Sequence, residues 1–170
     1  MFKNLNHALR WTYDVLERDI TGYSNTAAIM RLGEQCGASA STSPDDLTIQ
    51  EQKAQAVWVY DIIQLNTNEI SGTIINLTYG TESHACIYNL SATFGVDSNT
   101  EIECDVLCNI FKFAGDEYKM KRIADRHGKH EQTIYRIRDR LEKEIEPYRF
   151  RAEAAIENAL IEKGLINRLT

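Results

Sequence analysis

The sequence contains little proline, and its apolar runs are short. Two of its 170 residues are proline, Pro44 and Pro147, and nine are glycine. Proline interrupts helices and central strands, so its scarcity permits long helical segments. No segment shows sustained apolar–polar alternation, which disfavours half-buried strands. No apolar run approaches the roughly 20 residues that span a bilayer, and we expect no contact with a membrane.

The start of the chain lacks the basic end, apolar run and cleavage site of a signal peptide. We therefore expect a cytoplasmic protein, with reduced cysteines at Cys36, Cys86, Cys104 and Cys108. His84 and the last three cysteines form an alternative zinc set. Their spacing is not that of a zinc finger, and Cys104 and Cys108 have the spacing of helix neighbours. We interpret the cysteines as buried thiols and expect no metal.

The sequence shows no signature of catalysis. A glycine-rich phosphate loop, a nucleophile elbow and a His-Glu-x-x-His pair are all missing. His127 and His130 lie in a basic turn, where two solvated histidines are favoured over a metal pair. Asp61 is the one carboxylate inside a strongly apolar run, and a single such residue more often pairs with a cation than acts as a base. We expect no enzyme, no catalytic residue and no cofactor.

Apolar residues recur at helical spacing along most of the chain and predict an all-α fold of about eight or nine helices. Thr48 and Glu51 form a capping box, as do Ser98 and Glu101. Residues 37–46 are small and polar and predict a mobile loop. The helices preceding the basic segment are expected over residues 2–20, 24–33, 48–66, 67–79, 82–94 and 98–113.

Residues 1–114 are expected to form an acidic helical domain. The aromatic residues Trp11, Tyr13 and Tyr23 have two interpretations, an exposed surface for a partner or partial burial in the core, and burial is favoured. The residues expected to form its core are Leu9, Leu16, Val57, Ile62, Leu65, Ile74, Leu77 and Leu90.

Residues 118–145 form the only strongly basic stretch. Between Tyr118 and Lys143 there are nine Lys and Arg against four Asp and Glu, a net charge of +5. The whole chain carries −6, so the remainder carries −11. Positive charge concentrated on one short segment of an acidic protein indicates a surface for a polyanion.

The same stretch has the spacing of a helix-turn-helix. Ala124 provides a small side chain where two helices cross, Gly128 follows four residues later for the turn, and Ile134 comes six residues after that. Pro147 is expected to open a final helix that packs back on the protein or pairs with its copy in a homodimer. We thus predict a helical bundle with a C-terminal helix-turn-helix and a final long helix, and a DNA-binding region over 115–170. The inward apolar positions are Ile123, Ile134, Ile137 and Leu141.

The outward positions carry side chains that bind double-stranded DNA in other helix-turn-helix proteins. The helix from about Glu131 to Lys143 would enter the major groove. The residues predicted to contact phosphates are Lys119, Lys121, Arg122 and Lys129. Those predicted to contact bases or lie near them are Gln132, Arg136 and Arg140. Further predicted DNA-binding residues are His130, Thr133 and Tyr135.

The cadence Ile123-Ala124, Gly128, Ile134-Tyr135, Ile137-Arg138 resembles the end of the Mor/C-like activators of phage middle and late genes, as does the preceding DVLCNIFKFAG. The layout of the chain also resembles that of phage antitermination Q-like proteins. It has Trp11 in an N-terminal helix, a polar loop, the helix AQAVWVYDIIQL, the segment INLTYG and a C-terminal helix-turn-helix. Either resemblance implies a sequence-specific DNA-binding regulator of phage or prophage transcription, acting in the cytoplasm of a bacterial host cell. The Q-like version also implies antitermination with RNA polymerase as a partner.

Three alternatives remain open at this stage. The basic segment is also compatible with an ordinary helical hairpin with a solvated face. Such a hairpin would suit a protein-binding adaptor that acts as an anti-host factor. A DNA-packaging accessory protein would also use a helix-turn-helix, within a larger ring.

Overall fold

The computed structural model describes residues 2–18, 44, 47–80, 83–95 and 100–167. These residues form an all-α fold, which confirms the predicted class. None of the described helices is long and apolar enough to cross a membrane. The segment 24–33, Tyr23, Cys36 and all of the segment 37–46 except Pro44 lie outside the described residues. The helices are α1 (Leu5–Glu17), α3 (Ile49–Asn66), α4 (Glu69–Tyr79), α5 (His84–Phe94), α6 (Thr100–Ile110), α7 (Met120–Arg126) and α8 (Glu131–Glu162), with a 3-10 turn η2 (Asp116–Tyr118).

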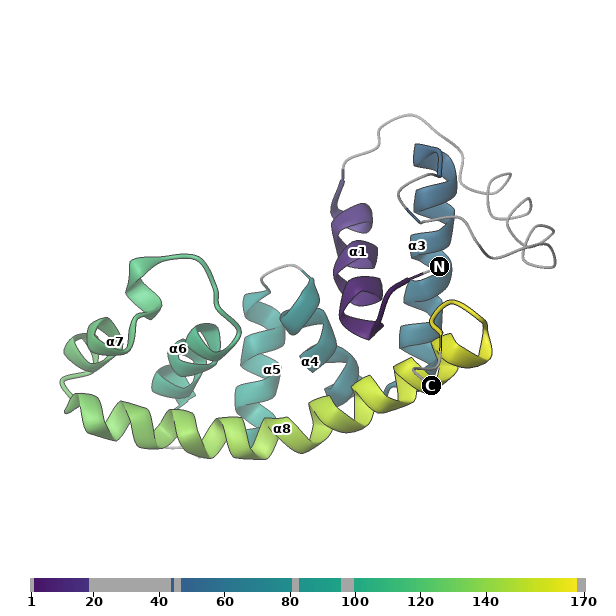
Figure 1. The fold of residues 1–170 in the computed structure, drawn as a ribbon. Helices are drawn as coiled ribbons and strands as arrows, with labels where there is room; N and C mark the ends of the chain where they lie inside the picture. The colour runs from purple at the N-terminus through teal and green to yellow at the C-terminus, as the bar shows by residue number, and fades with distance from the viewer. Residues whose placement is uncertain (1, 19–43, 45–46, 81–82, 96–99, 168–170) are drawn as a thin grey trace.

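Helix α8 forms one long side of the molecule, and the other helices pack along it in chain order. Figure 1 shows α7 and α6 at one end of α8, α5 and α4 near its middle, and α3 with α1 at the other end. With 32 residues, α8 is about 48 Å long. It curves toward the helices that it supports (Figure 1).

The predicted helix boundary at Pro147 is wrong, because α8 continues through this residue. A proline inside a helix removes one hydrogen bond and crowds the preceding turn. Pro147 is exposed, so the disturbed turn faces solvent, while Ile145 and Ala152 on the opposite side are buried. Burial on both sides of the proline keeps the helix continuous, and its curvature relieves the crowding.

The first hydrophobic cluster joins the two ends of the described chain. Side chains of α1 and α3 pack there with Ile156 and Leu160 of α8. The backbone N–H of Phe2 donates a hydrogen bond of 2.9 Å to the carbonyl of Leu165, and Phe2 is 2% exposed. Trp11 and Tyr13 are buried in this cluster, which confirms the favoured interpretation of these aromatics.

The second hydrophobic cluster fills the space between α8 and the helices α4 to α7. Leu90 of α5, Leu107 of α6, Ile123 of α7 and Ile134 and Leu141 of α8 are almost completely buried in it. Each cluster contains residues from both sides of position 114. The predicted boundary between 1–114 and 115–170 stays a prediction.

The residues expected in the core differ in how deeply they are buried. Leu16 and Val57 are only half-buried. Leu65 is 84% exposed, so its assignment to the core is wrong. Leu65 follows the buried Ile63 by two positions, about 200° around the helix, and so it lies on the opposite face of α3. The expected core residues that are buried are Leu9, Ile62, Ile74, Leu77 and Leu90.

The helix ends follow the local sequence closely. Thr48 and Glu51 form the predicted capping box at α3, and the Thr48 N–H donates to Glu51 Oε2 at 2.9 Å. Asn68 and Ser83 cap α4 and α5 with their side chains. The capping box predicted at Ser98 lies outside the described residues, and α6 is described from Thr100.

The continuity of α8 predicts the effect of replacing Pro147. In Pro147→Ala, the alanine N–H can bond the carbonyl four residues earlier, which raises the free energy of unfolding by about 1–3 kcal/mol. Chemical denaturation followed by circular dichroism measures the change. A helix that began at Pro147 would gain nothing from alanine, so an unchanged or lower stability would contradict a continuous α8.

Candidate nucleic-acid interface

The turn between α7 and α8 is a tight helix end followed by a new helix cap. Gly128 has φ of 58°, in the left-handed region that glycine adopts without strain. The Lys129 N–H donates to the Ala124 carbonyl at 3.0 Å, which closes the end of α7. His130 then caps α8, since its Nδ1 accepts from the Gln132 N–H at 3.2 Å. The chain therefore changes direction within four residues.

The inward side of this turn contains the apolar residues that the spacing predicted. Ile123, Ile134 and Leu141 have exposures of 0%, and Ala124 is 4% exposed. Ile137 is half-buried against the same cluster. Helix α6 covers this unit with Val106 and Leu107, so three helices share one apolar interior.

A carboxylate of α6 fixes the turn. Asp105 accepts from Arg126 at 2.7 Å and lies 2.8 Å from the His127 ring. Arg126 also donates to the Glu117 carbonyl at 3.2 Å. The expectation of two solvated histidines is wrong for His127, whose side chain is 14% exposed, because Asp105 draws it toward α6.

A second carboxylate of α6 holds Arg140. Glu103 is 1% exposed and forms an ion pair with Arg140, which also donates to the Phe94 carbonyl at 3.0 Å. A third contact joins Arg140 to Glu144 at 3.6 Å. Arg140 was predicted to contact bases, but here its guanidinium is turned toward α5 and α6. The structure does not place it with the outward-facing residues.

The other predicted DNA-contacting residues are all exposed. By helical geometry, Gln132, Arg136, Asp139 and Lys143 project from the side of α8 opposite the buried Ile134 stripe. Tyr135 lies beside them and is 43% exposed. Before α8, the exposed predicted residues are Lys119, Lys121, Arg122, Lys129 and His130, and within its first turn also Thr133.

The exposed cations differ in their pairing. Lys119 forms an ion pair with Asp116, which holds the pKa of that carboxyl below its ordinary value. Among the residues that the structure describes, five exposed cations of this segment form no ion pair, namely Lys121, Arg122, Lys129, Arg136 and Lys143. These five charges are the ones most available to an external anion.

The described cysteines do not form a metal centre. Cys86 and Cys104 are half-buried, Cys108 is buried, and none of the three forms a disulfide with another described residue. Burial raises the pKa of the Cys104 thiol. Across the described ranges, no group of three or more His, Cys, Asp or Glu side chains is placed to hold a metal ion.

Sequence reasoning missed the two carboxylates of α6 that organise this surface. The available signal was the acidic run Glu101, Glu103, Asp105 at alternate positions immediately before a basic segment. Alternate positions on a helix point in different directions, so Glu103 contacts α8 and Asp105 contacts the turn.

No protein family, no curated protein and no solved structure matches this chain.

Replacing two arginines that lie one helical turn apart should change the stability of the protein by very different amounts. Arg140→Ala removes the guanidinium that faces the buried Glu103 carboxylate and should lower the free energy of unfolding by about 2–3 kcal/mol. Arg136→Ala, on the exposed side, should change it by less than about 0.5 kcal/mol. Thermal melts of both variants measure this. Equal stability of the two would mean that Arg140 is not a structural residue.

Proposed function

We propose that this protein is a sequence-specific DNA-binding regulator of phage or prophage transcription. One observation carries the proposal. The exposed cations Lys121, Lys129 and Arg136, which form no ion pair among the described residues, surround the turn between α7 and α8. Apolar side chains of both helices are buried on the inner side of this turn. The resemblance of this segment to phage regulators supports the same function.

Electrostatics support a contact restricted to this end of the molecule. Tyr118 to Lys143 carry a net +5, and the rest of the chain carries −11. Phosphates are attracted to the basic segment and repelled by the acidic remainder. DNA would therefore meet α7 and the start of α8, with the other helices held away from it.

The geometry favours insertion of the first turns of α8 into the major groove. Helix-turn-helix proteins read bases with the N-terminal residues of the second helix while the first helix crosses the backbone. Gln132 and Arg136 are the side chains that would reach bases, and Lys121 and Lys129 would bind phosphates. Asp139 projects from the same side one turn later and would repel phosphates, so insertion would stop near that residue.

The proposal extends to RNA polymerase as a second partner. In a Q-like antiterminator, DNA binding precedes loading onto the polymerase, and the acidic helices would supply the polymerase-facing surface. A pull-down with purified polymerase tests this extension. Recovery of no polymerase, with DNA binding intact, would restrict the function to DNA.

Selection from a random DNA pool with the full chain, read by sequencing, tests the main proposal. A defined motif is the expected result, and a palindrome in it would indicate a homodimer. Binding to every sequence with steep salt dependence, and no motif, would contradict the proposal and favour the protein-binding hairpin.

Loss of Arg136 should weaken binding to the selected sequence and relax specificity at one position. Arg136→Ala is expected to cost about 1–3 kcal/mol of binding free energy in gel-shift titrations. Arg151→Ala, an exposed arginine in the distal half of α8, is the control and should bind normally. A normal affinity of Arg136→Ala would mean that another face of α8 enters the groove.

Loss of Lys121 should weaken binding to all sequences alike. Lys121→Ala is expected to lower the slope of log affinity against log salt by about 1, because one phosphate contact is removed. Titrations at several salt concentrations measure the slope. A loss confined to the selected sequence would contradict the assignment of Lys121 to the DNA backbone.

A further inference from the structure

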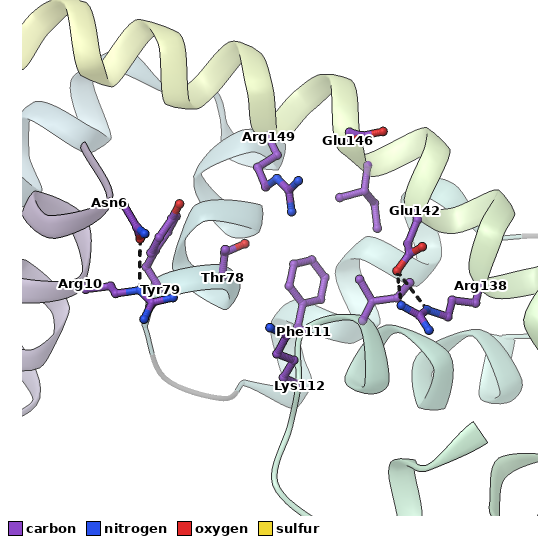
Figure 2. Close-up of a pocket in the computed structure, with 12 residues that line it drawn as sticks. Asn6, Arg10, Thr78, Tyr79, Phe111, Lys112, Arg138, Glu142, Glu146 and Arg149 are labelled. Atoms are coloured by element: carbon purple, nitrogen blue, oxygen red, sulfur yellow. Dashed lines mark hydrogen bonds and ion pairs between the residues drawn. The ribbon is translucent and has the colours of Figure 1, made fainter. Parts of the chain in front are cut away.

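A cavity of about 540 Å³ opens where the first and second hydrophobic clusters meet (Figure 2). It lies between α1, the end of α4, the turn after α6 and the middle of α8. Its volume falls within the roughly 300–1,000 Å³ of small-molecule sites. None of the residues predicted to contact DNA lines it, so it is a separate site.

The lining of this cavity is rich in positive charge. Two carboxylates, Glu142 and Glu146, also line it, and Glu142 pairs with one of its cations, Arg138, at 2.8 Å. The remaining three cations come from three different parts of the fold and share the same opening. The cations of the lining are Arg10, Lys112, Arg138 and Arg149.

Arg149 has hydrogen-bonding capacity that the described residues do not use. Its Nε is buried and has no hydrogen-bond partner among them. Arg149 forms a long ion pair with Glu153, with 3.9 Å between Nε and Oε1, and the same carboxylate accepts from the Tyr79 hydroxyl at 3.0 Å. Figure 2 shows Arg149 pointing from α8 into the space between Tyr79 and Phe111. A buried donor without a partner costs free energy that a bound acceptor would recover.

Lys112 occupies a backbone position that elsewhere in this chain is glycine. The Phe113 N–H donates to the Cys108 carbonyl at 2.9 Å, which closes the end of α6. The equivalent turns after α7 and α8 place Gly128 and Gly164 at φ of 58° and 70°. Lys112 adopts φ of 59° despite its side chain. The backbone is therefore strained at Lys112, a residue that lines the cavity. Backbone strain of this kind is often found at functional sites.

Two aromatic rings complete the lining. Tyr79 and Phe111 are half-buried, and in Figure 2 the Phe111 ring lies below the Arg149 guanidinium and Tyr79 lies to its left. Burial, together with the hydrogen-bonded Glu153 carboxylate, raises the pKa of Tyr79 to about 12, so its ring is neutral at physiological pH. Neutral rings bind flat apolar groups, and the neighbouring cations bind phosphate oxygens.

We propose that this cavity binds a small aromatic phosphate of the size of a nucleoside monophosphate. Arg10, Lys112 and Arg149 hold the phosphate, and the ring of the ligand packs against Tyr79 and Phe111. Arg10 belongs to α1 and Arg149 to α8. A bound phosphate would therefore contact both helices at once. This site does not depend on the proposed DNA contact.

Calorimetric titration of the full chain tests the proposal, with adenosine and uridine monophosphates as probes. Inorganic phosphate and uncharged adenosine serve as comparisons. Saturable binding at one site is expected for the nucleotides, tighter than for either comparison, with a raised melting temperature. No saturation by either nucleotide up to about 1 mM would overturn the proposal. Equal affinity for inorganic phosphate would overturn the role of the rings.

Matched variants locate the site. Arg149→Gln should weaken nucleotide binding by about tenfold or more. Arg151→Gln removes the same charge two residues later on α8, outside the lining, and should leave binding unchanged. Equal weakening by both variants would show that nucleotide binding depends only on the overall charge of the protein, and it would overturn the proposed site.

Lys112 offers a test in which stability and binding change in opposite directions. Lys112→Gly removes the backbone strain, so the free protein should melt at a higher temperature. The same variant should bind nucleotide several-fold more weakly, because one phosphate contact is lost. Unchanged nucleotide affinity in Lys112→Gly would overturn the role of Lys112.

Discussion

The apolar stripe of α8 is the constraint on which the remaining structure depends. Ile134, Leu141 and Ile145 belong to the second hydrophobic cluster, and Ile156 and Leu160 belong to the first. A single helix therefore supplies part of both interiors. Because an α-helix resists bending, the direction of its first turns is fixed relative to α1 and α3 at the far end, about 48 Å away.

Ion pairs within the protein decide which positive charges remain available. Of the nine cations between Tyr118 and Lys143, Lys119, Arg126, Arg138 and Arg140 pair with carboxylates of the chain itself. The net +5 of this segment therefore overstates the charge that a ligand meets. Carboxylates of α6 account for two of these four pairs, those of Arg126 and Arg140, and the other two partners belong to η2 and to α8 itself.

The sequence predicted what depends on neighbouring residues and failed where distant contacts decide. The capping box at Thr48 and the turn at Gly128 follow from spacing alone, and both are present. Pro147 suits a first helical turn equally well by local rules, but burial on both sides of it keeps α8 intact. Arg140 looked like a DNA contact because its partner, Glu103, lies 37 residues earlier and could not be paired with it from spacing. The cavity, which four separate segments line, had no local signal.

The hydrogen bond between Phe2 and Leu165 also bears on the order of folding. During synthesis, α1 and α3 leave the ribosome long before residues 152–166, which complete the first cluster. Until then their apolar sides lack part of their final contacts, whereas the second cluster is built from segments closer together in sequence, between residues 70 and 148. The apolar sides of α1 and α3 can therefore be fully covered only after residues 152–166 have been synthesised.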